Sequence, residues 1–549
     1  MVKAGGTSAT TAGAGIVLMT LAAGQFLMTL DSSVMNVSIA QVAEDVDTTI
    51  TGVQTAITLY TLMMATMMIT GGKIGSIIGH KRAFTIGCVV YAAGSLTTAL
   101  AQNLTVLIVG WSFLEGLGAA LIMPAIVALV ASNFPAAARP RAYGLVASAG
   151  AIAVAAGPLI GGAVTTLWTW RLVFAGEVVI VAAIVLLTRR IRDVETGRAK
   201  ARIDVVGVIL SASGLGIAVY GVLRSSEWGW VLSKGNPSLW GLSYSLVFIV
   251  AGALIVRVFF WWEQRELAAG KEPLVQPSML RNRQLTGGMT MFFFQFMIQA
   301  GLFFAVPLFL SVALGLSAFE TGVRLLPLSV TLLLAAVGIP RLWPQASPRR
   351  VVQWGLVAML AGIVALILAL DAGAGAEIVT VPMLLAGLGV GALSSQLGAV
   401  TVSSVSDEQS GEVGGLQNTA TNLGASLGTA LVGSVLITAL SASFFAGIEN
   451  NPAVPAETVS AGETQLASGV PFVSDEQLET ALRDAGLPED EIEAIREDNE
   501  TARIDGLRLS LSVLVLLALL ALYFTRLLPV TAVGQDASPG QRKESMPDT

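Results

Sequence analysis

The sequence predicts an all-α protein that crosses a membrane many times, and three observations carry this prediction. Hydrophobic residues make up 54% of the 549 residues and charged residues only 12%, about half the charged fraction of an average soluble domain. Apolar runs long enough to span a bilayer, which takes about 20 residues, recur along the chain. Lys and Arg gather in every second connection between these runs, as in polytopic membrane proteins.

Fourteen segments are predicted to be transmembrane helices. The run nearest the N-terminus is too long for a signal peptide, so we interpret it as a retained first helix. The predicted segments are 15–41, 51–71, 82–101, 104–132, 140–165, 171–188, 204–223, 238–260, 285–313, 318–340, 351–370, 377–402, 412–445 and 506–528.

The basic connections predict the orientation. They follow the second, fourth, sixth, eighth and tenth segments, and the first of them contains Lys81 and Arg82. Because basic connections stay in the cytoplasm, all five should face that side. With an even number of spans, the tails 1–14 and 529–549 should also be cytoplasmic. The expected location is the cell (inner or plasma) membrane.

The composition also excludes several function classes. The net charge of −6 gives no indication of a nucleic-acid partner. Cys88 is the only cysteine and His80 the only histidine, so an intrachain disulfide, a thiolate metal site and Ser-His-Asp chemistry are excluded. No nucleotide-binding P-loop pattern occurs. We therefore expect no enzyme and no cofactor, with a proton gradient as the energy source.

Residues 446–505 break the apolar pattern. They contain fifteen Asp and Glu against three Arg and follow an odd-numbered segment, so they should lie outside the cell. Ser474 and Gln477 form a capping-box pattern, and Pro488 can open a second helix. We predict a small two-helix extracellular insert that serves as a solvated cap. A docking site for an envelope partner is the alternative.

Three carboxylic residues lie inside predicted spans, where each costs about 2.5–3.5 kcal/mol on insertion scales. Asp31, Glu115 and Glu177 are therefore candidates for proton coupling or substrate binding, because a buried carboxyl group can exchange a proton near neutral pH. For Asp31 the alternative is a structural hydrogen bond. For Glu177 it is an ion pair with Arg171, six residues earlier.

Other polar or unusual residues in the spans have their own interpretations. Glu320 and Arg324, four residues apart, predict a structural ion pair. Gly157, Pro158, Gly161 and Gly162 predict a kink at a close helix crossing. Isolated amides are expected to line a cavity. For Gln295 and Gln299, which lie among phenylalanines, an apolar or cationic ligand would fit, but such a stripe more often packs against other helices or faces lipid. The predicted cavity residues are Asn36, Gln54, Gln295, Gln299 and Asn418.

Several motifs together resemble the major facilitator superfamily and, within it, the fourteen-helix drug:proton antiporters. The resemblance covers essentially the whole chain except the insert and the tails. Its cytoplasmic signature here includes Gly72, Gly75, Gly79, Lys81 and Arg82. The motifs are LDSSVMNVSI (30–39), GKIGSIIGHKR (72–82), GPLIGG (157–162), WRLVF (170–174), GLSAFETGVRLLP (315–327) and GGLQNTATNLGASLG (414–428).

The resemblance implies a fold of two six-helix bundles, 15–188 and 285–528, around a central cavity near the membrane midplane. Residues 189–284 then form a linker with two additional helices, and 446–505 form the insert of the second bundle. The implied function is export of small amphipathic compounds by alternating access in exchange for protons. The chain would act as a monomer, with the lipid bilayer and a small-molecule substrate as its partners.

This sequence also departs from the family pattern. Ser76 replaces an acid that helps latch the two bundles, so we expect a weaker latch or a substitute such as Asp407 or Glu408. Ser112 replaces an arginine tied to proton coupling, and Glu115 stands where the family often has glutamine.

These departures predict rearranged coupling and, through the added carboxylates, cationic or zwitterionic substrates. One alternative is export of a lipid or endogenous metabolite without standard proton coupling. A transporter-like sensor is another.

Overall fold

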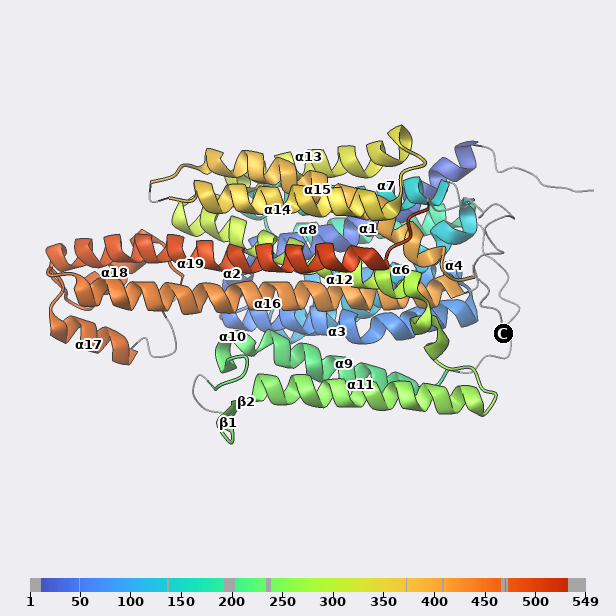
Figure 1. Cartoon of the computed structure of the whole chain (residues 1–549), viewed down its shortest axis with the longest axis horizontal. Helices are drawn as coiled ribbons and strands as arrows, with labels where there is room; N and C mark the ends of the chain where they lie inside the picture. The colour runs from blue at the N-terminus through green and yellow to red at the C-terminus, as the bar shows by residue number, and fades with distance from the viewer. Residues whose placement is uncertain are drawn as a thin grey trace, which may run out of the picture.

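The computed structural model describes residues 11–48, 50–135, 138–191, 203–233, 238–371, 373–406, 409–465, 470 and 472–531. In this part of the chain the secondary structure is almost entirely helical, and most long helices run along the long axis of the molecule (Figure 1). One short antiparallel hairpin, β1 (Ser238–Leu239) and β2 (Leu242–Ser243), is the exception.

The first bundle contains the helices up to residue 187. A π-helical segment, Ile108–Glu115, joins α5 to α6, so that Leu104–Asn133 is one long span. The helices are α1 (Thr11–Val37), α2 (Ile39–Asp45), α3 (Ile50–Ile78), α4 (His80–Ala99), α5 (Leu104–Leu107), α6 (Gly116–Asn133), α7 (Arg139–Leu167) and α8 (Arg171–Leu187), followed by a 3-10 turn at Thr188–Arg190.

The second bundle begins after a 3-10 turn at Pro277–Arg281. Its helices are α12 (Arg283–Leu308), extended by a π-helical segment Phe309–Ala313, then α13 (Ala318–Leu342), α14 (Pro348–Ala369), α15 (Thr380–Val402), α16 (Ser410–Asn450) and α19 (Glu489–Phe524). Short 3-10 turns at Ala376–Val379 and Thr525–Leu527 precede α15 and follow α19.

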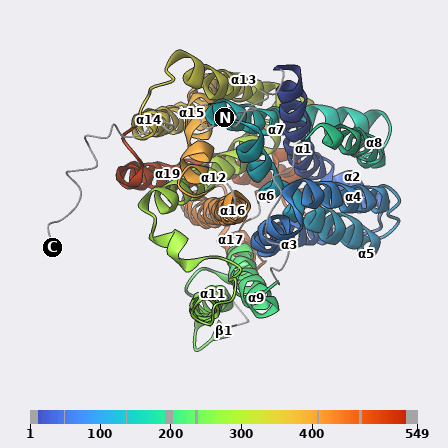
Figure 2. The same ribbon diagram turned by 90° about the vertical axis from the view of Figure 1, so that its right-hand side faces the viewer.

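The linker helices lie side by side at the periphery, next to α3 (Figure 2). They are α9 (Val205–Leu223), the single turn α10 (Ser225–Trp228) and α11 (Tyr244–Ala268). An aromatic cluster of Tyr220, Trp228, Tyr244 and Phe248 joins these three helices near the hairpin.

The predicted spans are helical over most of their length, but the segment predicted as 238–260 begins with the β1–β2 hairpin, and its helix, α11, runs from Tyr244 to Ala268. Twelve helices of the described chain are long and apolar enough to cross a membrane. The other two predicted spans correspond to α4 and α7. Helix α4 packs on α6 and α8, and α7 packs between α1 and α13. Because these two helices face other helices over much of their surface, they tolerate more Ser, Thr and Gly than a lipid-facing helix would.

The acidic insert lies at the end of the molecule opposite the connection between α3 and α4 (Figure 1). Ser474 and Gln477 form the expected capping box of α18 (Asp475–Asp484). The helix that follows Pro488 is α19, which continues without a break into the last span. A further helix, α17 (Ala456–Gln465), was not predicted.

The ion pair between Glu320 and Arg324 stays a prediction, because the close contacts of Glu320 in the described structure are with Ser317. Glu320 Oε2 accepts hydrogen bonds from the backbone N–H (2.9 Å) and hydroxyl (2.8 Å) of Ser317. This is a capping box at the start of α13. It satisfies backbone groups that the first helical turn leaves unpaired, so it competes with an exposed pair one turn further along.

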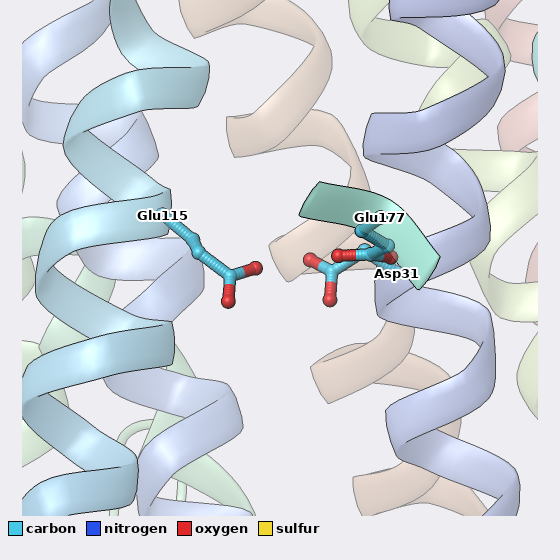
Figure 3. Close-up of side chains that lie close together, drawn as sticks. All are labelled: Asp31, Glu115 and Glu177. Atoms are coloured by element: carbon cyan, nitrogen blue, oxygen red, sulfur yellow. The ribbon is translucent and has the colours of Figure 1, made fainter. Parts of the chain in front are cut away.

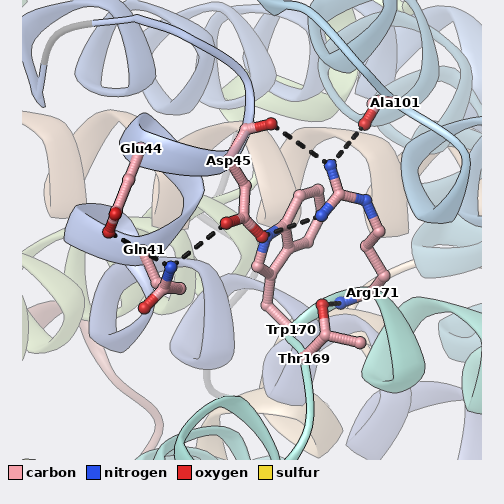
Figure 4. Close-up of polar contacts among 7 residues, drawn as sticks. All are labelled: Gln41, Glu44, Asp45, Ala101, Thr169, Trp170 and Arg171. Carbon is pink, nitrogen blue, oxygen red and sulfur yellow. Dashed lines mark hydrogen bonds and ion pairs between the residues drawn. The ribbon is translucent and has the colours of Figure 1, made fainter.

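A polar network around Asp45 joins α2 to α8 (Figure 4). Asp45 Oδ2 accepts hydrogen bonds from Trp170 Nε1 at 2.9 Å and Arg171 Nη1 at 2.8 Å. Arg171 Nη2 also donates to the carbonyl of Ala101 at 2.8 Å. Partial burial opposes ionisation, but hydrogen bonds from Gln41, Trp170 and Arg171 together hold the pKa of Asp45 below its ordinary value. Arg171 is therefore engaged with Asp45 rather than with Glu177.

Candidate functional site

A cavity of about 420 Å³ lies between the two bundles. It is lined by α1, α3, α6 and α7 on one side and by α12, α13, α15 and α16 on the other. Gln295, Gln299 and Asn418 are among its lining residues. The side chains of Asn36 and Gln54, which were also predicted to line a cavity, fall outside the described part of the structure.

The residues lining this cavity are uncharged wherever the structure describes them. The first bundle contributes four methionines, Met28, Met64, Met68 and Met123. The second bundle contributes Phe292, Phe296 and a row of amides. Large apolar side chains with a few oriented polar groups are typical of small-molecule binding sites.

The three candidate carboxylic residues converge in the first bundle, outside the cavity lining (Figure 3). Asp31 comes from α1, Glu115 from the end of the π-helical segment and Glu177 from α8. One carboxylate oxygen from each lies within 4.8 Å of the other two. All three residues are at most 1% exposed. We call this group the carboxyl trio.

Each member of the carboxyl trio has one oxygen bound by a neutral donor. Trp111 Nε1 donates to Asp31 Oδ1 at 2.8 Å, and the Thr98 hydroxyl donates to Glu115 Oε1 at 2.9 Å. Glu177 Oε2 accepts from Tyr91 at 3.2 Å and Ser95 at 3.1 Å. The second oxygen of each carboxyl group has no partner among the described residues.

These hydrogen-bond donors are neutral, so they do not balance a negative charge on the trio. None of the described ion pairs involves Asp31, Glu115 or Glu177. Three ionised carboxylates this close together in an apolar interior would repel one another strongly. The trio can hold protons, and its members should titrate as one coupled unit.

Local backbone features make room for this arrangement. The π-helical turn places Glu115 against α4, and such turns often occur at functional sites. Helix α4 presents Gly94 there, and a Cβ at Gly94 would lie only 2.6 Å from Glu115 Cγ. Ser112, where the family pattern has arginine, is buried and donates to the carbonyl of Ala56 at 2.7 Å. The positive charge that the family pattern has at position 112 is therefore missing here.

The trio and the cavity are neighbours along α1. Ser32 lines the cavity, whereas the adjacent Asp31 points to the trio on another face of the same helix. Tyr60 and Trp111 stack with parallel rings, with 4.8 Å between the ring centroids, beside Asp31. Asp31 of the trio and Ser32 of the cavity lining are thus consecutive residues of α1.

The bundles are joined at the signature connection by a buried ion pair. Lys73 Nζ of α3 lies 3.1 Å from Glu412 Oε1 of α16, and the two side chains are 3% and 1% exposed. Ser76, in place of the family's acid, donates within its own helix to the carbonyl of Lys73. A charged contact between the bundles is therefore present here, but its acid is Glu412 and not the residue at position 76. Asp407 and Glu408, the predicted substitutes, fall outside the described residues.

Glycines bring the two bundles into backbone contact around this pair. A Cβ at Gly72 would lie 2.5 Å from the carbonyl oxygen of Gly411, and one at Gly415 would lie 2.8 Å from that of Met68. On the other side of the cavity, a Cβ at Gly144 of α7 would lie 2.6 Å from the carbonyl oxygen of Ala336 in α13. The described structure is therefore closed at the end where the basic connections lie.

Other residues of the signature shape the turn between α3 and α4. Gly79 has φ of 98°, a backbone conformation that favours glycine. A Cβ at Gly75 would lie 2.9 Å from His80 Nδ1. Lys81 donates to the carbonyl of Ile191, after α8, at 3.0 Å, and Arg82 is exposed.

The glycine motif of α7 lies against α1. A Cβ at Gly157 would overlap the Ser33 side chain, and one at Gly161 would lie 3.0 Å from Val34. Gly162 is half-buried, and the side chain of Pro158 falls outside the described part. The close crossing is present, and α7 is one continuous helix from Arg139 to Leu167.

Sequence reasoning missed the partners of these groups. Lys73 lies in the motif GKIGSIIGHKR, but its partner was not predicted, although Glu412, an acid in an apolar segment just before GGLQN, was a usable signal. Trp111, Tyr91 and Thr98 could not be recognised as donors to the trio, because they lie 80, 86 and 17 residues from their acceptors.

Comparison with known proteins identifies relatives among exporters. A tetracenomycin C resistance and export protein of Streptomyces glaucescens is 30% identical over 76% of this chain and 75% of its own length. The puromycin resistance protein pur8 of Streptomyces alboniger is 29% identical over 81% of this chain and 86% of its own length. A multidrug resistance protein, Stp, of Mycobacterium tuberculosis is 26% identical over 80% of this chain and 79% of its own length.

Solved structures show the same fold at low identity. The human organic anion transporter MFSD10 aligns with a TM-score of 0.56 and 10% identity over 93% of this chain and 99% of its own. The POT family transporter PepTSo aligns with a TM-score of 0.55 and 12% identity over 94% of this chain and 98% of its own.

These relatives are named for drug export or resistance and the structural neighbours for transport, in agreement with the sequence analysis. The model of the Major Facilitator Superfamily matches residues 21–429, and the chain belongs to that family.

Proposed function

We propose that this transporter exports small amphipathic compounds across the cell membrane in exchange for protons. The observation that carries the proposal is the pairing of two separate sites on α1, the uncharged cavity at Ser32 and the carboxyl trio at Asp31. The relatives named for tetracenomycin C export and for puromycin and multidrug resistance support export as the direction.

The proposed mechanism is alternating access of the two bundles around the cavity. In the described state, the Lys73–Glu412 pair and the glycine contacts close one end, which the basic connections assign to the cytoplasm. Substrate leaves from the opposite end, and the trio takes up protons there. Reopening toward the cytoplasm requires the ion pair to break, after which the protons are released inside.

The three carboxyl groups have the proton role in this proposal and not the role of a counter-charge for a cation. The expectation of cationic or zwitterionic substrates came from these carboxylates, and since they are not among the residues that line the cavity, the proposal does not use them to bind substrate. Because the carboxyl groups that bind protons do not contact the substrate, the same groups can couple proton movement to the export of chemically different substrates.

Everted membrane vesicles test the proposal directly. Vesicles that contain the protein should accumulate an exported compound, such as tetracenomycin C or puromycin, when respiration acidifies their interior. Collapse of the pH gradient with nigericin should abolish accumulation. Uptake that continues without a pH gradient would refute proton exchange, and the absence of uptake for a broad panel of compounds would refute drug export.

A further inference from the structure

The linker between the bundles carries a positively charged surface that the proposed transport cycle does not use. We propose that the cytoplasmic end of α11 binds the headgroup of an anionic phospholipid through Arg257 and Arg265, which lie on either side of Trp261. We call these three residues the Arg–Trp–Arg row. Helix α11 does not line the central cavity, so this is a second binding surface, separate from the one proposed for substrate.

Helix α11 presents most of its surface to lipid. Only 17% of its apolar window is buried, the smallest share among the twelve candidate spans. The helix lies at the periphery and packs mainly against α9 (Figure 2). Leu254, Val258 and Trp261 are 58%, 46% and 58% exposed. An apolar helix face of this kind is expected to contact the acyl chains of the bilayer.

The acidic residues near the end of α11 face the protein. Glu263 and Glu266 are 0% and 8% exposed. Oε2 of Glu263 accepts a hydrogen bond from the backbone N–H of Val275 at 3.3 Å, and Oε1 of Glu266 lies 3.0 Å from Lys271 Nζ. These two acids therefore do not neutralise the arginines on the lipid-facing side of the same helix.

Arg257 and Arg265 are both exposed on the lipid-facing side. Neither forms an ion pair with a residue in the described part of the chain. Arg257 lies eight residues, about 12 Å along the helix axis, further from the cytoplasmic end than Arg265 does. A guanidinium group at that depth is unfavourable without a counter-charge. The phosphate of a lipid headgroup can supply this counter-charge from the membrane itself.

The two arginines can converge on one headgroup. Side chains of a helix lean toward its N-terminus, and Arg265 accordingly lies over the indole rings of the preceding turn. Its guanidinium carbon is 5.9 Å from the ring centroid of Trp261 and 5.8 Å from that of Trp262. Its charge is thus displaced toward Arg257, whose long stem can extend toward the headgroups. Two guanidinium groups that approach from either side of Trp261 match the oxygens of one phosphodiester.

The tryptophans hold this end of α11 at the level of the headgroups. Trp262 Nε1 donates to Oδ2 of Asp204, the N-cap residue of α9, at 2.8 Å, so its ring is fixed against the linker. Trp261 is exposed beside it, and indole side chains favour the membrane interface. Oε2 of Glu272, just beyond α11, lies 3.9 Å from Lys73 Nζ, which places this end on the side of the basic connections.

The charge of the Arg–Trp–Arg row selects between headgroups. Phosphatidylglycerol brings a net negative charge, which both arginines attract. Phosphatidylcholine carries a quaternary ammonium group next to its phosphate, and the same two arginines repel that cation. The row should therefore favour an anionic phospholipid over a zwitterionic one.

Native mass spectrometry of the purified full chain tests the proposal. The chain is delipidated in detergent and incubated with dioleoyl phosphatidylglycerol or, in a separate sample, with the same amount of dioleoyl phosphatidylcholine. We expect phosphatidylglycerol to be retained at least fivefold more, because each basic residue near an anionic headgroup contributes about a factor of five. Equal retention of the two lipids by the unsubstituted chain would overturn the proposal, and this comparison needs no variant to fold.

Substitution of the arginines locates the site. Arg257→Gln/Arg265→Gln should lose the preference for phosphatidylglycerol. The matched control is Arg189→Gln/Arg190→Gln, which removes two exposed arginines from the turn after α8 and should keep the preference. An equal loss in both double variants would show that the lipid responds to basic charge in general and would overturn the assignment to α11.

Fluorescence quenching places the lipid beside the row. Nanodiscs of phosphatidylcholine contain a small fraction of brominated lipid, and the emission of Trp261 is taken as the difference between the unsubstituted chain and Trp261→Phe. Brominated phosphatidylglycerol should quench this emission more strongly than brominated phosphatidylcholine does. Equal quenching would overturn the proposed site. Both measurements are made at equilibrium without a gradient or substrate, so a failure of proton-coupled export would leave their outcome unchanged.

Discussion

Lys73 and Glu412 form a buried ion pair between the two bundles, with 3.1 Å between Nζ and Oε1. The residues are 339 positions apart in the chain, and Glu272 of the linker lies 3.9 Å from the same Lys73 Nζ. Three parts of the chain thus meet at one lysine. We propose that this contact holds the bundles together in place of an acid at the position of Ser76.

Breaking this pair should favour the state open to the cytoplasm. Removal of one member of a buried ion pair leaves the other charge uncompensated, at a cost of about 3–5 kcal/mol. In Lys73→Met that cost falls mainly on the closed state, because opening lets water reach Glu412. Accessibility from the cytoplasmic side can be measured with Gln417→Cys in a Cys88→Ser background. We expect this cysteine to react with an impermeant maleimide, added to everted vesicles, at least tenfold faster when Lys73→Met is present than when it is absent.

The charge-reversal variant Lys73→Glu/Glu412→Lys is the control for this prediction. It restores the opposite charges and should return the labelling rate toward that of the parent. Equal labelling in the parent and in Lys73→Met would show that the ion pair does not hold the cytoplasmic side closed.

A side chain added at the glycine contact between α7 and α13 should also favour opening toward the cytoplasm, in this case by steric clash. A side chain at Gly144 would overlap the carbonyl of Ala336, since even its Cβ would lie 2.6 Å from that oxygen. Gly144→Leu should therefore disfavour the closed state and raise labelling of Gln417→Cys severalfold. Gly338→Leu on α13 is a matched control, because a Cβ there meets nothing within 4 Å. Equal effects of the two substitutions would contradict the steric explanation.

The network around Asp45 should contribute stability that depends on pH. Its pKa in the folded protein is lower than the ordinary value of about 3.9. The contribution is therefore complete above about pH 4 and is lost as the pH falls through the folded-state value. The side chains of Asp45 and Arg171 are 26% and 27% exposed, so the pair itself should contribute at most about 1 kcal/mol.

Thermal unfolding in detergent measures this contribution. Asp45→Asn should lower the unfolding temperature by a constant amount between pH 8 and pH 5, and the difference from the parent should shrink below pH 4. Asp47→Asn, two residues away at an exposed position, should show no such difference. A difference for Asp45→Asn that grows as the pH falls would contradict the assignment.

The sequence allowed much of this fold to be predicted, because a bilayer imposes a simple rule on helix length and polarity. The same rule identified Asp31, Glu115 and Glu177 one at a time as unusual. It could not show that they converge, since α1, the π-helical segment Ile108–Glu115 and α8 are brought together by packing that no local pattern encodes.

In two places a residue had more than one possible partner. Glu320 bonds to Ser317, whereas the spacing predicted a pair with Arg324. Arg171 pairs with Asp45 across 126 residues, so the nearby Glu177 is left to neutral donors. The choice among partners in these cases depends on helix ends and crossings, which spacing along the chain does not determine.

Proton release from proteoliposomes tests the role of the carboxyl trio most directly. Proteoliposomes loaded at low pH and diluted into a weakly buffered medium with a pH indicator should release protons when an exported compound is added. Glu115→Gln removes one titratable member of the trio and should abolish this release, while Glu320→Gln, which changes an exposed glutamate, should preserve it. Substrate-dependent release that is as large in Glu115→Gln as in the unsubstituted protein would contradict the proposed coupling.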